Sequence, residues 1–549
     1  MFHVEHMYME IIGKIVDPVM RRIYGAKIII NNGIIEHILP YQGDTNFYIM
    51  PGFVDAHVHI ESSMLTPQRF SELAIVQGTV AVVSDPHEIA NVLGVNGVDF
   101  MIENAKLAKL KVFFGAPSCV PATSFETSGA KILASDISKM FEENKVWYLS
   151  EMMNYPGVIF NDPEVMEKMA IAKKFNKPID GHAPALDDES IVKYAAAGIT
   201  TDHECISLHE ALVKIDNGMK ILIREGSAAK NFDTLASLIH SNPSDCMFCT
   251  DDCHPDNLID GHINLLFKRA LKLGYSVFDI LQVSVLNAIH HYNIPVGYLQ
   301  CGQPADFIIV DNLADLNVLQ TYIKGEKVFD RSLVLSQPIY EVNKYNVFYK
   351  NELNISKLEV KTDMNPVRVI DVIDGELYTK SFAFTLPVVQ NRIQSSLEHD
   401  IIKIINLNRY YVSDPVIGFI HNFGLKKGAI ASTIAHDSHN IIAVGANDAD
   451  LLIVLEEMQR LEGGVVVYDG TSLHSISLEI AGLITAGNPY VLSEQYRHLN
   501  SIIATMGCKL HAPLMTLSFM ALLVIPELKI GDKGLFDGQT FSLVSLRSV

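Results

Sequence analysis

Short apolar runs recur eight times in the first half of the chain, and each ends in polar residues before a segment long enough for a helix. They span residues 53–59, 79–85, 112–118, 146–151, 178–183, 198–204, 220–225 and 246–252. Continuous apolar runs of this kind are typical of strands that are buried on both faces of a parallel sheet. Eight strand–helix alternations predict an α/β fold, a TIM-like (β/α)8 barrel whose active site lies at the C-terminal ends of the strands.

The segments that flank the barrel carry a different pattern. An apolar triplet at residues 28–30, an Asn-Asn-Gly turn and a second apolar pair at residues 34–35 predict a β-hairpin. Residues 307–311 read as a buried strand after the barrel. We therefore expect residues 1–50 and 295–345 to form one composite small β domain beside a barrel of residues 51–294.

The remaining residues, 346–549, exceed what the barrel and the small β domain need. Two strand-like runs, at residues 367–372 and 378–386, precede an amphipathic helix at residues 450–462. A further strand follows that helix at residues 463–468. We expect a separate C-terminal α+β domain.

Composition limits the partners of the protein. With 43 basic and 63 acidic residues the formal net charge is −20, which disfavours nucleic acid and anionic membranes. No run of about 18 apolar residues is present, so we expect no membrane span. The seven cysteines do not suggest a disulfide framework, and Cys246 and Cys249 fit a buried strand better than a zinc or redox site. We expect a cytoplasmic protein that forms a homo-oligomer.

Polar residues follow the apolar runs at the end where a barrel places its active site. His57 and His59 are two apart at the end of the first run, so their side chains point the same way and suit a transition-metal ion. The later runs add Asp85, His87 and Glu88, then Glu151, His182, His203, and finally Asp251 and Asp252. Any one of these fits a satisfied polar residue at a strand end, but together they predict a metal centre.

The number of candidate ligands indicates two divalent ions. The ligands are His57, His59 and Asp251 for one ion and His182 and His203 for the other, with Glu151 as the bridge. Two ions about 3.5–4 Å apart generate a nucleophilic hydroxide at neutral pH. Asp251 is placed to take its proton and pass it to a leaving group, and Asp252 is the second candidate for that role. This chemistry is hydrolysis at a carbon that bears nitrogen or oxygen.

Several stretches resemble a known family. Residues 51–59, Pro-Gly-Phe-Val-Asp-Ala-His-Val-His, resemble the first-strand signature of the amidohydrolase superfamily, and residues 302–307 resemble the point where its chain re-enters the small β domain. More narrowly, the chain is similar to the bacterial adenine deaminases at residues 59–64, 84–92, 250–252 and 435–440. The resemblance extends from about residue 10 to the end.

This resemblance implies hydrolysis of a purine base, adenine, to hypoxanthine and ammonia at a binuclear site, with Mn²⁺ expected first and Fe²⁺ or Zn²⁺ as alternatives. Relatives that carry a carboxylated lysine need Lys at the end of strand four, where this chain has Glu151. Two alternatives stay open: another binuclear amidohydrolase, such as a deacetylase or cyclic-amide hydrolase, and a non-catalytic scaffold on the same fold.

The residue that protonates the purine ring is not the one that mononuclear purine-nucleoside deaminases use, because their glutamate is replaced by Ala185. Glu88 and Asp85 are the candidates, and capping of the following helix is the alternative for both. Glu61, Ser62 and His87 are expected to orient ligands or contact the substrate. Residues 436–439, His-Asp-Ser-His, read either as a hydrogen-bonded loop, the favoured interpretation, or as a loop that closes over the barrel mouth. The Arg-Glu pair at residues 224–225 is expected to be structural.

Overall fold

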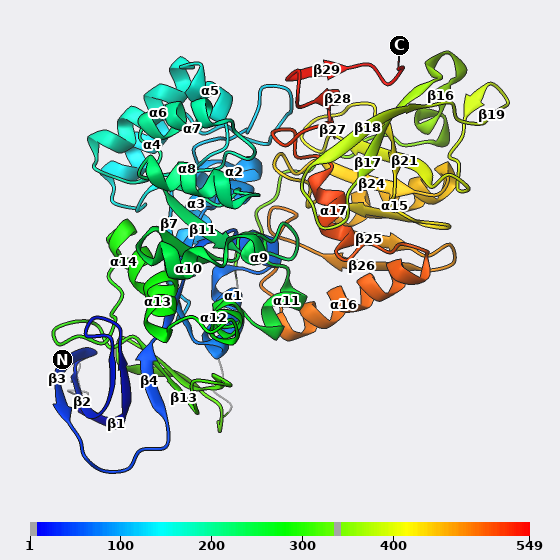
Figure 1. Ribbon diagram of the computed structural model, residues 1–549. Coiled ribbons are helices and arrows are strands. Elements are labelled where there is room, and N and C mark those ends of the chain that lie inside the picture. Colours follow the sequence, from blue (N-terminus) through cyan, green and yellow to red (C-terminus); the bar gives the residue numbers. More distant parts are fainter. Residues whose placement is uncertain (1–7, 334–341, 549) are drawn as a thin grey trace.

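The computed structural model describes residues 8–333 and 342–548, and eight of its strands form a barrel (Figure 1). The strands are β5 (Phe53–Val58), β6 (Thr79–Ser84), β7 (Lys111–Phe114), β8 (Leu149–Met152), β9 (Ile179–Gly181), β10 (Thr201–Asp202), β11 (Lys220–Arg224) and β12 (Cys246–Cys249). Five neighbouring pairs form parallel ladders: β5–β6, β6–β7, β8–β9, β10–β11 and β11–β12. A parallel bridge from Ala116 to Leu149 and a hydrogen bond from Thr200 N–H to Ile179 O join the remaining neighbours, and a parallel bridge from Val58 to Asp251 closes the ring. The predicted (β/α)8 barrel is confirmed, and each strand lies within or beside its expected run.

Helices cover the outside of the barrel. The main ones are α1 (Pro67–Ala74), α3 (Val95–Ala105), α4 (Ala134–Glu142), α6 (Pro163–Lys174), α7 (Asp188–Ala196), α8 (Leu208–Asp216) and α12 (Ile263–Lys272). Helix α6 shows why the sequence sets these boundaries. Asp162 accepts hydrogen bonds from the first free N–H groups of the helix, Pro163 occupies its first turn, and Lys173 and Lys174 lie at its negative end.

The small β domain is a single seven-stranded sheet, built from the chain segments that precede and follow the barrel (Figure 1). Its order is β15 (Glu326–Asp330), β14 (Val318–Ile323), β13 (Phe307–Val310), β4 (Tyr48–Pro51), β1 (Tyr8–Asp17), β2 (Arg22–Asn31) and β3 (Ile34–Pro40). The β2–β3 pair confirms the predicted hairpin. We propose that these strands form one composite domain and that the barrel comprises residues 51–294.

The C-terminal part contains an eight-stranded sheet that packs beside the barrel (Figure 1). Its order is β18 (Thr379–Phe384), β17 (Val367–Val372), β22 (Val416–His421), β21 (Ile401–Leu407), β24 (Ile441–Gly445), β23 (Ala429–Ser432), β25 (Gly464–Tyr468) and β26 (Leu473–Ser477). Helix α15 (Asp448–Leu461) packs on this sheet and confirms the predicted amphipathic helix. Buried apolar residues of the barrel and of this part form one continuous cluster, so we propose that the two domains share a core.

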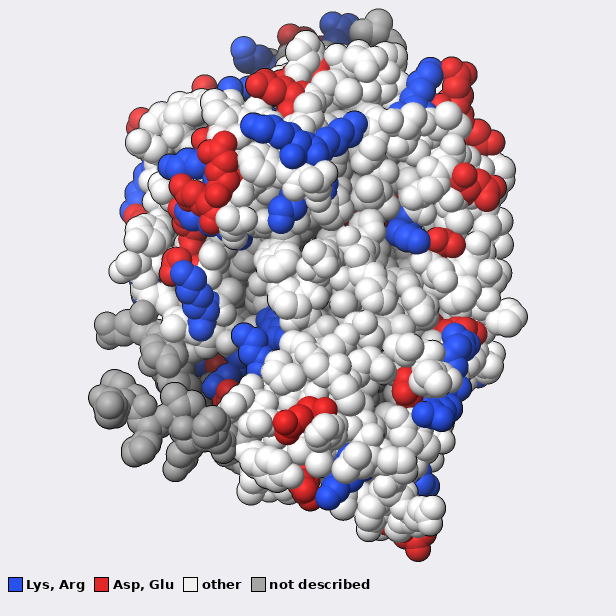
Figure 2. Space-filling view, turned by 90° about the vertical axis from the view of Figure 1, so that its left-hand side faces the viewer, with Lys and Arg blue, Asp and Glu red and all other residues white. Residues whose placement is uncertain are grey.

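Two features of the structure concern the surface charge and the length of the helices. On the face shown in Figure 2, acidic and basic side chains are interspersed and form no extended basic patch. Among the described residues no helix is both long and apolar enough to span a bilayer.

Lys529 on β27 (Leu528–Gly531) is fully buried, and burial lowers the pKa of its ammonium group to about 7. Because the unfolded pKa is about 10.4, the unfolded chain binds more protons between pH 7 and 10.4. The stability of the protein should therefore rise with pH across this range, by several kcal/mol at most. Lys529→Met should flatten that dependence in chemical unfolding at pH 7 and 9.5. Lys533→Met, which changes an exposed lysine on the next turn, should leave that dependence unchanged. If the free energy of unfolding changed equally with pH in the wild type and both variants, the proposed effect of Lys529 would be contradicted.

Candidate metal centre

Strand β5 brings two imidazoles to the C-terminal mouth of the barrel. His57 Nε2 and His59 Nε2 lie 3.2 Å apart. Asp251, which follows β12, places Oδ1 3.6 Å from the first and 3.1 Å from the second. The backbone keeps these residues together, because Asp251 N–H donates to His57 O and His59 N–H donates to Asp251 O. All three side chains are buried.

Glu151, at the end of β8, lies between two groups of histidines. Its Oε1 is 3.4 Å from both His59 Nε2 and His87 Nδ1. Its Oε2 is 3.0 Å from His182 Nδ1 and 3.1 Å from His203 Nε2. Burial alone would raise the pKa of Glu151, but the facing imidazoles of His182 and His203 hold it well below its usual value. An ionised carboxylate that faces imidazoles with both oxygens is suited to bridging two cations.

The donor atoms fit a divalent metal. Ligands held about 2.0–2.2 Å from a tetrahedral ion lie about 3.3–3.6 Å from one another, and the separations among His57, His59 and Asp251 are 3.1–3.6 Å. His182 Nδ1 and His203 Nε2 also approach to 3.2 Å. A cation shared by such imidazole pairs satisfies both nitrogen lone pairs in a buried site.

Glu204 and Arg224 extend the site, and sequence reasoning did not assign a role to Glu204. Glu204 Oε1 lies 3.4 Å from His203 Nε2 and 3.6 Å from His182 Nδ1, so it is a further candidate ligand. Arg224 contacts Glu204 and donates to Asp251 Oδ2 at 2.6 Å. Arg224 thus forms a buried ion pair, in line with its predicted structural role, and this pair includes the candidate ligand Asp251.

The residues after β6 have different surroundings. Asp85 Oδ1 accepts a hydrogen bond from His87 N–H, and Asp85 Oδ2 lies 3.1 Å from His87 Nδ1. Through these contacts Asp85 holds the first residue of helix α2 (His87–Leu93) and orients the His87 imidazole. With His59 and Glu151, both residues also form a group of buried donors close enough to share a cation. His87 is therefore a candidate ligand as well as a neighbour of the ligands.

Three other predicted residues lie close to these donors. Glu61 accepts a hydrogen bond from Ile89 N–H, and burial raises the pKa of its carboxyl to about 7. Ser62 donates to Asp252 Oδ1, and burial also raises the pKa of Asp252. Asp252 is therefore held by a serine, whereas the neighbouring Asp251 faces the histidines. This difference favours Asp251 over Asp252 as the proton acceptor.

The loop at residues 436–439 is hydrogen-bonded, as the favoured interpretation predicted, and it also reaches the barrel, as the alternative required. His436 Nδ1 lies 2.7 Å from Glu88 Oε1, and His439 Nε2 contacts the other oxygen of the same carboxylate. Asp437 Oδ1 lies 3.8 Å from His87 Nε2. Glu88 is thus held by the C-terminal domain beside the donor cluster, a long-range pairing that no local pattern encodes.

Comparisons with known proteins place the chain in a family. The amidohydrolase family model matches residues 48–328, and the model for the adenine deaminase C-terminal domain matches residues 376–542. The adenine deaminase of Methanosarcina acetivorans is 49% identical over 97% of this chain and 99% of its own length. Those of Parabacteroides distasonis and Borreliella burgdorferi are 44% and 43% identical, over 97% and 99% of this chain and 98% and 99% of their own lengths. Membership of the amidohydrolases implies a divalent metal at this donor cluster. The chain belongs to the adenine deaminase family of amidohydrolases.

Proposed function

We propose that the protein hydrolyses adenine to hypoxanthine and ammonia, using two divalent ions held by the cluster around Glu151. The substrate rests on full-length relatives that carry the name adenine deaminase. The proposal of two ions is supported by the position of Glu151. One of its oxygens faces His59, and the other faces His182 and His203. Mn²⁺ is the ion that we propose first, and Fe²⁺ and Zn²⁺ suit the same ligands.

The chain's own residues handle the protons of this reaction. Bound divalent ions lower the pKa of water, so that hydroxide is available at neutral pH. Asp251 accepts the proton of the attacking water and delivers it to the amino group that leaves as ammonia. Burial favours a protonated Asp251, but Arg224 and His203 hold its pKa well below the usual value, which keeps the carboxylate ready to accept a proton.

Glu88 is the group that we propose to protonate the purine ring. Burial favours a neutral His436, yet Glu88 and Asp252 raise the pKa of this imidazole to about 9. A proton is therefore stored at His436 Nδ1, 2.7 Å from the Glu88 carboxylate, at neutral pH. Glu88 can pass it to the purine ring, and the proton that the C6 hydroxyl loses when ammonia departs then restores the Glu88–His436 pair. The contacts of Asp85 suit an orienting role.

Metal-reconstituted protein tests the proposal directly. Apoprotein loaded with Mn²⁺ should release ammonia from adenine, with hypoxanthine as the product, and should release none from adenosine or cytosine. Removal of the metal by a chelator should abolish turnover, and re-addition should restore it. Absence of activity with Mn²⁺, Fe²⁺ and Zn²⁺ alike would refute the substrate assignment, and hydrolysis of an N-acetyl sugar or a cyclic amide instead would favour another amidohydrolase.

The protein's location and assembly also remain proposals. The described cysteines are all free thiols, and most of them are buried, which supports the predicted cytoplasmic location. We propose that the protein forms a homo-oligomer, which sedimentation analysis can test by measuring its mass in solution.

A further inference from the structure

A cavity of about 460 Å³ is lined by residues of both the barrel mouth and the C-terminal domain. Its barrel side includes Glu204 and Arg224, the pair that contacts the candidate ligands. Its opposite side is formed by residues 376–380 and 525–527 of the C-terminal domain. The cavity thus reaches from exposed residues to the pair that contacts the donor cluster, and its size suits a small ligand.

A larger cavity nearby does not make this connection. It measures about 710 Å³ and is lined by residues 118–124 after β7, by residues 154–165 and by exposed Leu133. None of the candidate ligands is among its described lining residues. Volume therefore does not decide which cavity serves the site, whereas contact with Glu204 and Arg224 does.

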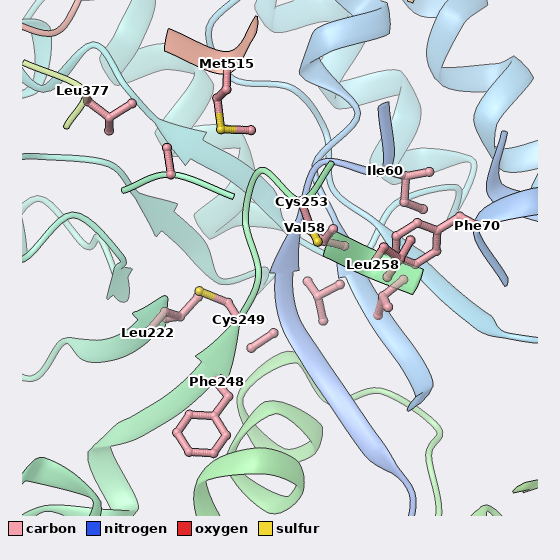
Figure 3. Close-up of a cluster of buried hydrophobic side chains, with 14 of the residues drawn as sticks. Val58, Ile60, Phe70, Leu222, Phe248, Cys249, Cys253, Leu258, Leu377 and Met515 are labelled. Atoms are coloured by element: carbon pink, nitrogen blue, oxygen red, sulfur yellow. The ribbon is translucent and has the colours of Figure 1, made fainter. Parts of the chain in front are cut away.

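The C-terminal domain presents apolar side chains to the barrel mouth. Leu377 and Met515 lie beyond the end of β5, on the side to which the strand points (Figure 3). Leu377 lines the 460 Å³ cavity, and Met515 belongs to α17 (Pro513–Phe519). Both side chains are buried in the cluster that joins the two domains. Leu377 gives the cavity an apolar wall, which suits the face of a flat aromatic ring.

The buried amine of Lys529 holds both the segment that contains Leu377 and the end of helix α17. Lys529 Nζ donates to Leu377 O at 2.5 Å and to Phe519 O, at the end of α17, at 3.0 Å. Thr379 Oγ1 donates to Leu528 O beside it. The position of Leu377 is therefore set by the C-terminal fold, independently of the metal ligands.

The charges around the cavity favour an uncharged ligand. Its outer lining carries two lysines, Lys230 and Lys380, and two glutamates, Glu376 and Glu527. The arginine on its floor already pairs with Glu204 and Asp251. Both lysines are exposed to solvent, so no buried, unpaired cation among the described lining residues offers a site for a phosphate, which a nucleotide would require.

We propose that this interdomain cavity is the purine entrance and outer binding pocket, and that Leu377 is a specificity-determining residue which contacts the base. The inference rests on the proposed function and deepens it, because it assigns recognition of an uncharged purine base to the C-terminal domain. The proposed metal ligands all lie on and around the barrel strands.

Leu377→Trp and Leu377→Ala test this assignment in the metal-loaded, full-length protein. The tryptophan variant fills the cavity and should lower kcat/KM for adenine by at least about 10-fold, mainly through KM. The alanine variant removes the contact without adding bulk and should raise KM by about 10-fold with little change in kcat. Calorimetry should show the same weakening for hypoxanthine, a reading that does not depend on turnover. Metal content should be unchanged in both.

Leu133→Trp is the matched control, because it adds the same bulk at the 710 Å³ cavity, where Leu133 is half exposed. It should leave KM, kcat and hypoxanthine binding unchanged, and adenosine 5′-monophosphate should not compete with adenine in any variant. Wild-type kinetics in both Leu377 variants would overturn the entrance assignment while leaving the proposed function intact. A wild-type protein that neither deaminates adenine nor binds hypoxanthine would overturn both.

Discussion

Glu151→Gln is expected to lower kcat/KM for adenine by at least about 1,000-fold. Activation by bound ions contributes several kcal/mol to such reactions, and each 1.36 kcal/mol corresponds to a factor of ten. Glutamine keeps the size of the side chain but presents an NH₂ group to one set of imidazoles in place of the second oxygen. Elemental analysis should show fewer than two ions per chain, alongside the loss of turnover.

Glu126→Gln is the control for this change. Glu126 is another buried carboxyl, and burial raises its pKa to about 8, so it is protonated at neutral pH and glutamine is a close mimic. Its activity and metal content should match the wild type. Full metal occupancy and normal turnover in Glu151→Gln would show that Glu151 is not the bridge.

Glu88→Gln is expected to lower kcat by about 100- to 10,000-fold, the usual range for loss of a positioned acid or base. The amide can still hydrogen-bond to His436 and His439, but it cannot pass a proton to the purine. Because Glu88 is held mainly by the C-terminal loop, the variant should retain its metal. Steady-state kinetics and elemental analysis on the same preparation separate the two effects.

The outcome of this test distinguishes proton transfer from helix capping. Turnover near that of the wild type would remove Glu88 from the reaction and leave its acidic side chain as support for helix α2. Glu126→Gln again serves as the comparison, since it changes another buried carboxyl that faces the 436–439 loop, at Ser438.

Local pattern was sufficient to predict the barrel and to select most of the site. Strands buried on both faces leave continuous apolar runs, and the parallel order brings their ends to one edge, so the sequence predicts that His57, His182 and Asp251 lie together. The composite sheet was equally predictable, because its strands keep strong β patterns on both sides of the barrel.

Three features could not be derived this way. Glu204 directly follows His203, and strand alternation would direct the two side chains to opposite faces; strand β10 ends at Asp202, so alternation no longer applies there. The contacts of Glu88 with His436 and of Leu377 with the barrel mouth depend on how two domains pack. Such packing joins residues that are hundreds of positions apart, and no periodicity encodes it.

The two-part β domain has a consequence for how the chain is made. Strand β4 lies between β1 and β13, and β13 begins about 250 residues after β4 ends. At about 5–20 residues per second of synthesis, β4 stays an unpaired edge for tens of seconds while the barrel emerges from the ribosome. An exposed edge can pair with another nascent chain. The yield of folded enzyme should therefore depend on translation speed and on chaperones that bind the first fifty residues.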